Sequence, residues 1–271
     1  MNLRAFAEKA VPLGDKRMTG MAETVDTLPL ADLGRGAPVL LLHGGGGPQS
    51  VKAFAELLAD HARVLLPTHP GFAGSPYVSR VTTVADIAKL YVAILEQMDL
   101  ERVTVVGVSI GGWIACELAL TAPHLLAGIV LVDSVGLQVA GEDVLDVFAT
   151  PRELMPGLTF HDPARFARAP ESQSLHEKDA MAANFAALAR YGRDVRMQDA
   201  TLAPRLAALD LPTLVVWGES DKVVSPAYGR AFAAAIPGAR FAIIDEAGHF
   251  PQVEQPLRLV EHVVREISSG R

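Results

Sequence analysis

Short apolar runs that alternate with helical segments constrain this chain more than any other feature of its sequence. The runs, each ending in turn-forming residues, are Pro38–Leu42, Arg63–Leu66, Val103–Val106, Gly128–Val132, Thr213–Trp217 and Arg240–Ile244. Helical periodicity occurs at Val51–Ala59, Val84–Met98, Gly112–Thr121, Pro226–Ala235 and Pro256–Ile267. Apolar strands that alternate with helices are typical of a parallel sheet covered on both faces, so the sequence predicts an α/β fold. The segment Thr24–Leu33 is expected to add one antiparallel edge strand.

One long stretch interrupts this alternation. From Ser134 to Asp210 no strand of that type occurs, and prolines, phenylalanines and methionines are scattered among charged residues. An insertion of this length between two strands is usually functional when it packs. We expect residues 134–210 to form a helical cap, or lid, over the strand ends, where open α/β sheets bind ligands. Residues 1–133 and 211–271 would then form the core domain.

The composition of the chain excludes several classes of function. Half of the 271 residues are hydrophobic, which suffices for a sizeable core. The net charge is −7 and the basic residues are scattered, so nucleic acid is not an expected partner. The apolar runs are too short to span a bilayer, and Met1–Val11 lacks the apolar segment of a secretory signal. We therefore expect a cytoplasmic protein that acts on a small molecule without a membrane partner, and the sequence leaves homo-oligomer formation open.

The segment Gly107-Val108-Ser109-Ile110-Gly111 lies between a predicted strand and a predicted helix. A serine on such a tight turn needs small residues two positions before and two after it. The turn pushes the hydroxyl out of the sheet, beside a helix N-terminus that favours negative charge. A phosphate-binding turn would need a different glycine pattern or a lysine that this segment lacks. Ser109 is therefore a candidate nucleophile.

A serine nucleophile requires a base and an acid that orients the base. Asp221 and His249 each follow a predicted strand, at the edge of the sheet where Ser109 is expected. The chain order Ser109, Asp221, His249 is the order found with a nucleophile elbow. Asp133 is the rival acid, because it also follows a predicted strand.

The glycine-rich segment His43-Gly44-Gly45-Gly46-Gly47-Pro48 follows the strand Pro38–Leu42. Glycines let the backbone approach a substrate closely. We expect the N–H groups of Gly45 and Ile110 to form an oxyanion hole, and the ring of His43 to hold the loop. The histidines outside these motifs lack metal-ligand spacing, so no metal is expected.

These motifs, each at the end of a predicted strand, resemble the α/β-hydrolase superfamily of serine hydrolases over about residues 25–268. The resemblance implies an eight-stranded sheet, no cofactor and a cap that bears the substrate pocket. The loop of residues 68–75 lacks the acid and one glycine that relatives often carry there, which leaves the subfamily open. Serine at position 109 disfavours dehalogenase and epoxide hydrolase chemistry, because those relatives use aspartate.

The expected reaction is hydrolysis of a small carboxylic ester through an acyl-enzyme. The alternative is cleavage of a C–C bond in a meta-cleavage product, a vinylogous diketone whose carboxylate similar enzymes bind with a cap arginine. Candidates for that role are Arg152, Arg165, Arg168, Arg190, Arg193 and Arg196. A third interpretation is a non-catalytic ligand-binding protein of this fold. It is disfavoured because Ser109, Asp221 and His249 are all present.

Overall fold

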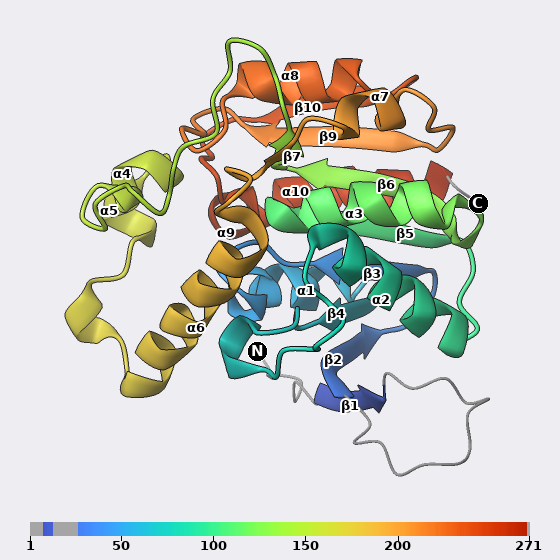
Figure 1. Cartoon of the computed structure of the whole chain (residues 1–271), viewed down its shortest axis with the longest axis horizontal. Helices are drawn as coiled ribbons and strands as arrows, with labels where there is room; N and C mark the ends of the chain where they lie inside the picture. Colours follow the sequence, from blue (N-terminus) through green and yellow to red (C-terminus); the bar gives the residue numbers. More distant parts are fainter. Residues whose placement is uncertain (1–7, 13–26, 270–271) are drawn as a thin grey trace.

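The computed structural model describes residues 8–12 and 27–269, and within them most strands form one sheet (Figure 1). Its strands are β1 (Glu8–Pro12), β2 (Thr27–Gly34), β3 (Pro38–Leu42), β4 (Arg63–Pro67), β5 (Val103–Val108), β6 (Leu126–Val132), β9 (Thr213–Gly218) and β10 (Arg240–Ile244). Their order in this eight-stranded sheet of the described residues is β1-β2-β4-β3-β5-β6-β9-β10. Neighbours from β4 to β10 are parallel, whereas β2 runs antiparallel to β1 and β4. The predicted α/β class with a mostly parallel sheet is confirmed.

Helices cover both faces of this sheet (Figure 1). The core helices are α1 (Lys52–Leu58), α2 (Val84–Gln97), α3 (Ile110–Thr121), α8 (Pro226–Ala234) and α10 (Pro256–Ser269), with shorter turns η1 (Pro48–Val51), η2 (Phe72–Gly74), η3 (Pro123–Leu125) and α9 (Pro251–Glu254). One apolar cluster joins α2, α3 and α8 to the sheet, and a second joins α1 and α10 to the opposite face. Successive strand residues divide between the two clusters, as Val105 and Val106 of β5 do.

Local capping determines where two of these helices begin. The Thr83 hydroxyl accepts a hydrogen bond from the Asp86 N–H, and the Asp86 side chain accepts one from the Thr83 N–H. This capping box begins α2, and the Ser225 hydroxyl caps α8. In contrast, α3 begins at Ile110 directly after Ser109 without a side-chain cap. Its first N–H groups therefore lack helical acceptors and can serve a ligand.

The predicted position of the antiparallel strand requires a correction. Strand β2 is antiparallel within the predicted segment Thr24–Leu33, whose first residues, 24–26, lie outside the described ones. However, β2 is not the edge of the sheet, because β1 pairs with its outer side. Strand β1 escaped prediction because it is mostly exposed and carries Glu8 and Lys9, so no apolar pattern marks it. Backbone pairing with β2 places it there, and Val11 packs against the apolar core.

The segment predicted as a cap adds no strand to the main sheet among the described residues. It holds β7 (Gly136–Leu137), β8 (Gln198–Asp199), α4 (Met155–Thr159), α5 (Pro163–Phe166), η4 (Pro170–Ser172), α6 (Leu175–Gly192) and α7 (Leu202–Leu206). Helices α4, α5 and α6 lie to one side of the sheet, near α9 (Figure 1). The rings of Phe148 and Phe185 pack with centroids 5.5 Å apart, and Met197 is buried. These apolar side chains therefore contribute to the packing of the segment itself.

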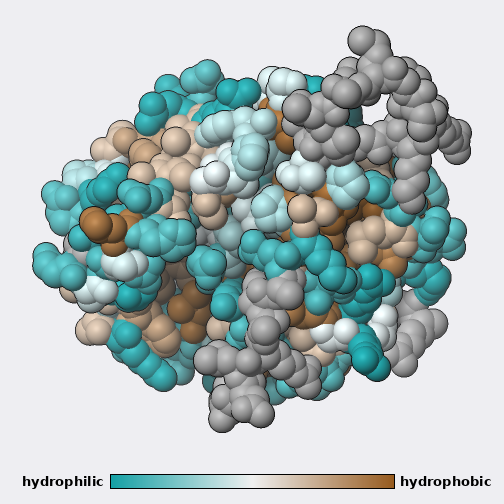
Figure 2. All heavy atoms as spheres, turned by 90° about the horizontal axis from the view of Figure 1, so that it is seen from below, coloured by the Kyte–Doolittle hydropathy of each residue, from teal (hydrophilic) through white to brown (hydrophobic). Residues whose placement is uncertain are grey.

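Apolar side chains on the surface form separate patches between polar ones, as the face seen in Figure 2 shows. On α6 and just before α4, Leu175 is 80% exposed and Leu154 is 55% exposed. None of the helices in the described ranges 8–12 and 27–269 is both long and apolar enough to cross a membrane.

A partly buried ion pair connects α7 to α3, the helix that follows Ser109. The guanidinium of Arg205 donates two hydrogen bonds of 2.7 Å to the carboxylate of Glu117, which lies in α3. Arg205 also donates to Asp199 in β8 at 2.7 Å. The side chain of Glu117 is only 6% exposed. It therefore depends on Arg205 to compensate its charge.

Substitution Arg205→Leu is expected to lower the free energy of unfolding by about 3 kcal/mol, because it leaves the Glu117 charge buried and unpaired. Urea unfolding at neutral pH measures this change. The double variant Arg205→Leu with Glu117→Leu should recover much of the loss, because no buried charge remains. If the double variant is less stable than Arg205→Leu, the unpaired charge is not the cause.

Candidate functional site

Ser109 occupies a strained turn between β5 and α3. Its φ and ψ are 54° and −117°, in a region that residues with a side chain rarely adopt. Glycines on both sides make the turn sterically feasible. A Cβ on Gly107 would lie 2.3 Å from the Gly111 carbonyl oxygen, and a Cβ on Gly111 would lie 2.3 Å from the Leu42 carbonyl oxygen. Small residues are therefore required here for close packing of α3 against β5 and β3.

The structure brings the side chains of Ser109, His249 and Asp221 together. The Nε2 atom of His249 lies 3.1 Å from the Ser109 Oγ, and its Nδ1 lies 2.8 Å from Asp221 Oδ2. All three residues are buried, with Ser109 the most accessible at 9%. The loop after β9 carries Asp221 and the loop after β10 carries His249. Because β9 and β10 are parallel neighbours, their carboxyl ends meet at one edge of the sheet.

The backbone orients the carboxylate of Asp221. Its Oδ1 accepts hydrogen bonds from the N–H groups of Val223 at 2.8 Å and Val224 at 3.1 Å. These bonds leave Oδ2 directed at the His249 ring. With Nδ1–H donating to Asp221, the Nε2 of His249 is free to accept the Ser109 proton.

The rival acid Asp133 is also buried beside this group. It directly follows β6 and has a φ of 44°. Its Oδ1 accepts a hydrogen bond of 2.8 Å from the Gly218 N–H. Burial raises the pKa of its carboxyl group well above the usual range, and the nearby charge of Asp221 raises it further. The Nδ1–H of His249 donates its hydrogen bond to Asp221, so the structure pairs the histidine with Asp221 rather than Asp133.

Residues 157–162 of the predicted cap are hydrogen-bonded to both of these loops. The His249 N–H donates to the Thr159 carbonyl at 2.7 Å, and the Lys222 N–H donates to the Leu158 carbonyl at 3.3 Å. The buried carboxylate of Glu254 in α9 adds a third connection, because it accepts the N–H groups of His161, Asp162 and Gly248. Sequence reasoning missed Glu254, since a glutamate in a helical segment carries no signal of burial.

The predicted oxyanion loop lies against the serine. A Cβ on Gly44 would stand 3.1 Å from the Ser109 Cβ, and the Gly47 N–H closes the loop by donating to the Gly44 carbonyl at 3.0 Å. Ile110 is the first residue of α3, so its N–H has no acceptor within the helix. The structure therefore places the predicted donors Gly45 and Ile110 on the two segments that flank the Ser109 side chain.

Helix α6 covers this loop from the side of the predicted cap. The side chain of Asn184 donates to the Gly46 carbonyl at 2.9 Å and accepts from the Ala73 N–H at 2.7 Å. Leu188, one turn further along α6, lies over Gly45, with its Cδ2 2.9 Å from where a Cβ would be. Sequence reasoning also missed Asn184, whose one visible signal is its place between alanines and Phe185 in a helix.

Hydrogen bonds of two buried histidines hold the predicted oxyanion loop in place. His43 Nδ1–H donates to the Gly44 carbonyl at 2.8 Å, and its Nε2 accepts from the His69 N–H at 3.1 Å. His69 Nε2–H donates to the His43 carbonyl at 2.9 Å, and its Nδ1 accepts from the Tyr91 hydroxyl. These partners assign each ring one proton, so both histidines are neutral. Burial lowers the pKa of His43 to about 4. Burial, and the repulsion that two protonated rings would exert on each other, lower the pKa of His69 well below 6.5.

The burial of His43 and His69 in their neutral form predicts that the protein loses stability in mild acid. Above the ordinary histidine pKa of 6.5, both rings are neutral folded and unfolded. Below it, the unfolded chain binds protons that the folded protein excludes, so the free energy of unfolding should fall as pH decreases from 6.5 towards about 4. Each unit of lowered pKa contributes about 1.4 kcal/mol to this change.

Urea unfolding at successive pH values tests the prediction. The variant His69→Gln, with one titrating ring fewer, should be less stable at pH 7.5 and should lose less stability between pH 6.5 and 4. Equal pH dependence of the two proteins would show that His69 does not exclude a proton.

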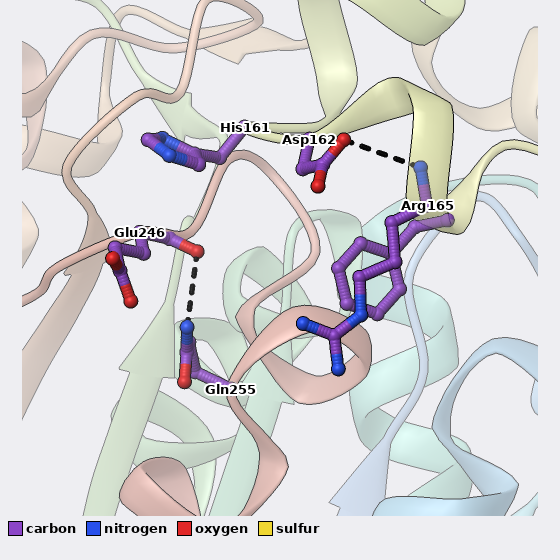
Figure 3. A pocket seen from close by; sticks show the side chains of 6 residues that line it. His161, Asp162, Arg165, Glu246 and Gln255 are labelled. Atoms are coloured by element: carbon purple, nitrogen blue, oxygen red, sulfur yellow. Dashed lines mark hydrogen bonds between the residues drawn. The ribbon is translucent and has the colours of Figure 1, made fainter.

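A polar pocket lies outside the Ser109 group. Its volume is about 300 Å³, and it lies between the start of α5 and the segment that follows β10. Figure 3 shows Asp162 and Arg165 on one side and Glu246 with Gln255 on the other. The residues that line it are His161, Asp162, Arg165, Phe166, Glu246 and Gln255. Neither Ser109 nor His249 belongs to this lining, so the pocket is separate from the candidate site.

Comparisons with known proteins agree with this architecture. Residues 39–262 match the model of the alpha/beta hydrolase family. A 2-hydroxymuconate semialdehyde hydrolase of Pseudomonas putida is 28% identical over 264 residues, which cover 88% of this chain and 90% of that protein. A thermophilic esterase from Thermogutta terrifontis, solved with malate bound, superposes with a TM-score of 0.71 and 25% identity, covering 97% of this chain and 99% of that one.

A further relative is the dihydrolipoyllysine-residue acetyltransferase component of an acetoin-cleaving system from Cupriavidus necator. It is 30% identical over 226 residues, which cover 80% of this chain. The aligned region spans 60% of that protein's length. The chain therefore belongs to the α/β-hydrolase family, as its sequence motifs predict, and it is an enzyme of that family.

Proposed function

We propose that the protein hydrolyses a small carboxylic ester, with Ser109 as nucleophile, His249 as base and Asp221 as the acid that orients His249. The observation that carries this proposal is the continuous pair of contacts from Ser109 Oγ to His249 Nε2, at 3.1 Å, and from His249 Nδ1 to Asp221 Oδ2, at 2.8 Å. A serine becomes nucleophilic when a positioned base accepts its proton.

In this mechanism, Ser109 Oγ attacks the ester carbonyl while its proton passes to His249 Nε2. The charge of Asp221 stabilises the resulting imidazolium, and the N–H groups of Gly45 and Ile110 bind the oxyanion. His249 then protonates the departing alcohol, and the acyl group remains on Ser109. A water molecule that gives a proton to His249 attacks this acyl-enzyme. His249 then returns the proton to Ser109 Oγ as the carboxylic acid is released.

The apolar surroundings of the serine favour an ester with an uncharged acyl or alcohol group. Leu188 lies over Gly45, and the ring of Phe250 packs edge-on against the His249 ring with centroids 5.6 Å apart. Phe160 lies against Phe250 in turn, at 5.2 Å. Side chains of this kind exclude water from a bound substrate and strengthen the oxyanion contacts.

The cap arginines favour the ester over the C–C bond alternative. A substrate carboxylate would need an inward-facing arginine, but Arg152, Arg165, Arg168, Arg190, Arg193 and Arg196 are all exposed. Most of them are engaged elsewhere. Arg190 lies over the Tyr77 ring, Arg193 lies over the Phe148 ring, and Arg168 forms an ion pair with Glu177. This distribution supports a substrate without a carboxylate.

Substitution Ser109→Ala should lower kcat/KM for short-chain p-nitrophenyl esters by at least about 10³-fold, because the attacking atom is removed. A fluorophosphonate probe should label the wild-type protein and not this variant. Ser172→Ala, which changes an exposed serine in η4, is the matched control and should be labelled like the wild type. Equal ester hydrolysis by wild type and Ser109→Ala would contradict the proposal.

The same wild-type protein also distinguishes ester hydrolysis from the alternative reaction, cleavage of a C–C bond. Wild-type protein is offered a ring-fission dienoate and a series of uncharged esters under identical conditions. We expect kcat/KM for the best ester to exceed that for the dienoate, because all six candidate cap arginines are exposed. Rapid dienoate turnover with negligible ester hydrolysis would assign the protein to C–C bond cleavage instead.

A further inference from the structure

The carboxyl group of Asp133 has an oxygen without a hydrogen-bond donor. Asp133 is completely buried at the end of β6, and its Oδ1 is occupied by the Gly218 N–H. Its Oδ2 is buried and has no hydrogen-bond partner in the part of the chain that the structure describes. A buried acceptor without a donor is costly, and a buried charge without a partner is more so.

Charged groups crowd this carboxyl. One oxygen of Asp133, one oxygen of Asp221 and one ring nitrogen of His249 all lie within 4.8 Å of one another. The carboxylate of Glu254 is a further negative neighbour. Two buried carboxyl groups thus lie beside His249, and a third lies near Asp133. Ionisation of all three would place like charges together in a medium of low dielectric constant.

The hydrogen bonds indicate which of the three carboxyl groups is neutral. Asp221 accepts from the N–H groups of Val223 and Val224 and from the His249 ring. Glu254 accepts N–H groups from two separate loops. Donors of this kind stabilise the ionised form of a carboxyl group. Asp133 has one such donor, so the proton is best placed on Asp133.

We propose that Asp133 is protonated at neutral pH and that its Oδ2–H donates a hydrogen bond to the carboxylate of Asp221. An oxygen of Asp133 lies within 4.8 Å of an oxygen of Asp221, and two carboxylates so placed cannot pair with each other because both only accept hydrogen bonds. A proton on Oδ2 turns the unpartnered acceptor into a donor. Burial and the charge of Asp221, which raise the pKa of Asp133, act in the same direction.

The role of Asp133 in catalysis rests on the proposed function. If Asp221 orients His249, then Asp133 is a positioning residue that acts through Asp221. Its O–H fixes the Asp221 carboxylate and takes up part of its charge. The imidazolium form of His249 is then less strongly stabilised, so the ring stays neutral and able to accept the Ser109 proton to a lower pH.

Infrared spectroscopy of the unmodified protein tests the protonation without any substrate. At pH 7, the difference spectrum of wild type minus Asp133→Asn should contain the C=O stretching band of a protonated carboxyl group. Asp245→Asn is the matched control, because Asp245 is an exposed residue that pairs with Arg258. Its difference spectrum should lack that band. Absence of the band from the Asp133 difference spectrum would overturn the proposal, whether or not esters are hydrolysed.

Two variants test the positioning role. Asn at position 133 is neutral, can accept from the Gly218 N–H and can donate to Asp221, whereas Ala can do neither. Asp133→Asn should retain roughly ten times the kcat/KM of Asp133→Ala, the scale of one buried hydrogen bond. The acid limb of the pH profile should lie at higher pH in Asp133→Ala, because Asp221 then holds the imidazolium proton more strongly.

Thermal unfolding verifies that both variants fold, and asparagine tolerates the positive φ at this position. Equal losses of kcat/KM in the two variants would overturn the positioning role. An acid limb of the pH profile that does not move in Asp133→Ala would overturn it as well. The infrared result separates that outcome from a failure of the proposed ester hydrolysis, because it requires no turnover.

Discussion

The close approach of α3 to the end of β3 is the constraint on which the candidate site depends. At Gly111 the helix backbone comes so near to the Leu42 and His43 carbonyls that any side chain would collide with them. This contact fixes the start of α3, the strained turn at Ser109 and the loop after β3 as one rigid unit. The Ser109 hydroxyl thereby lies close to the backbone of the loop after β3 and of the start of α3. No side chain has to move to bring them together.

Hydrogen bonds between buried polar groups hold the remaining parts around this unit. His43 and His69 are neutral rings that tie the oxyanion loop to Tyr91. The backbone N–H groups of Val223 and Val224 hold one oxygen of Asp221, and the His249 ring contacts the other. Interior packing of this kind depends on every donor having an acceptor, because unpaired groups are costly in a medium of low dielectric constant. The site is therefore organised by hydrogen-bond pairing as much as by shape.

Much of this arrangement could be predicted from the sequence, because it rests on backbone requirements that leave a local signature. The apolar strands indicate the sheet, and the glycines around Ser109 indicate the edge of the sheet at which the candidate site lies. Strand β1 could not be predicted, since backbone pairing places it at the sheet edge and only Val11 packs against the core. Glu254 and Asn184 could not be predicted either, because their roles depend on which distant N–H groups face them. Such long-range polar contacts have no periodicity along the chain.

The hydrogen bonds from residues 157–162 to the loops of Asp221 and His249 bear on how enzymes of this kind could diversify. In this chain, that part of the predicted cap is hydrogen-bonded to the loops that carry His249 and Asp221. Helix α6, in contrast, meets the site through Asn184 and Leu188 alone among the contacts described above. Exchange of the whole cap between relatives would therefore disturb the histidine itself. Changes confined to the inner face of α6 would alter the accepted substrate while His249 and Asp221 keep their positions.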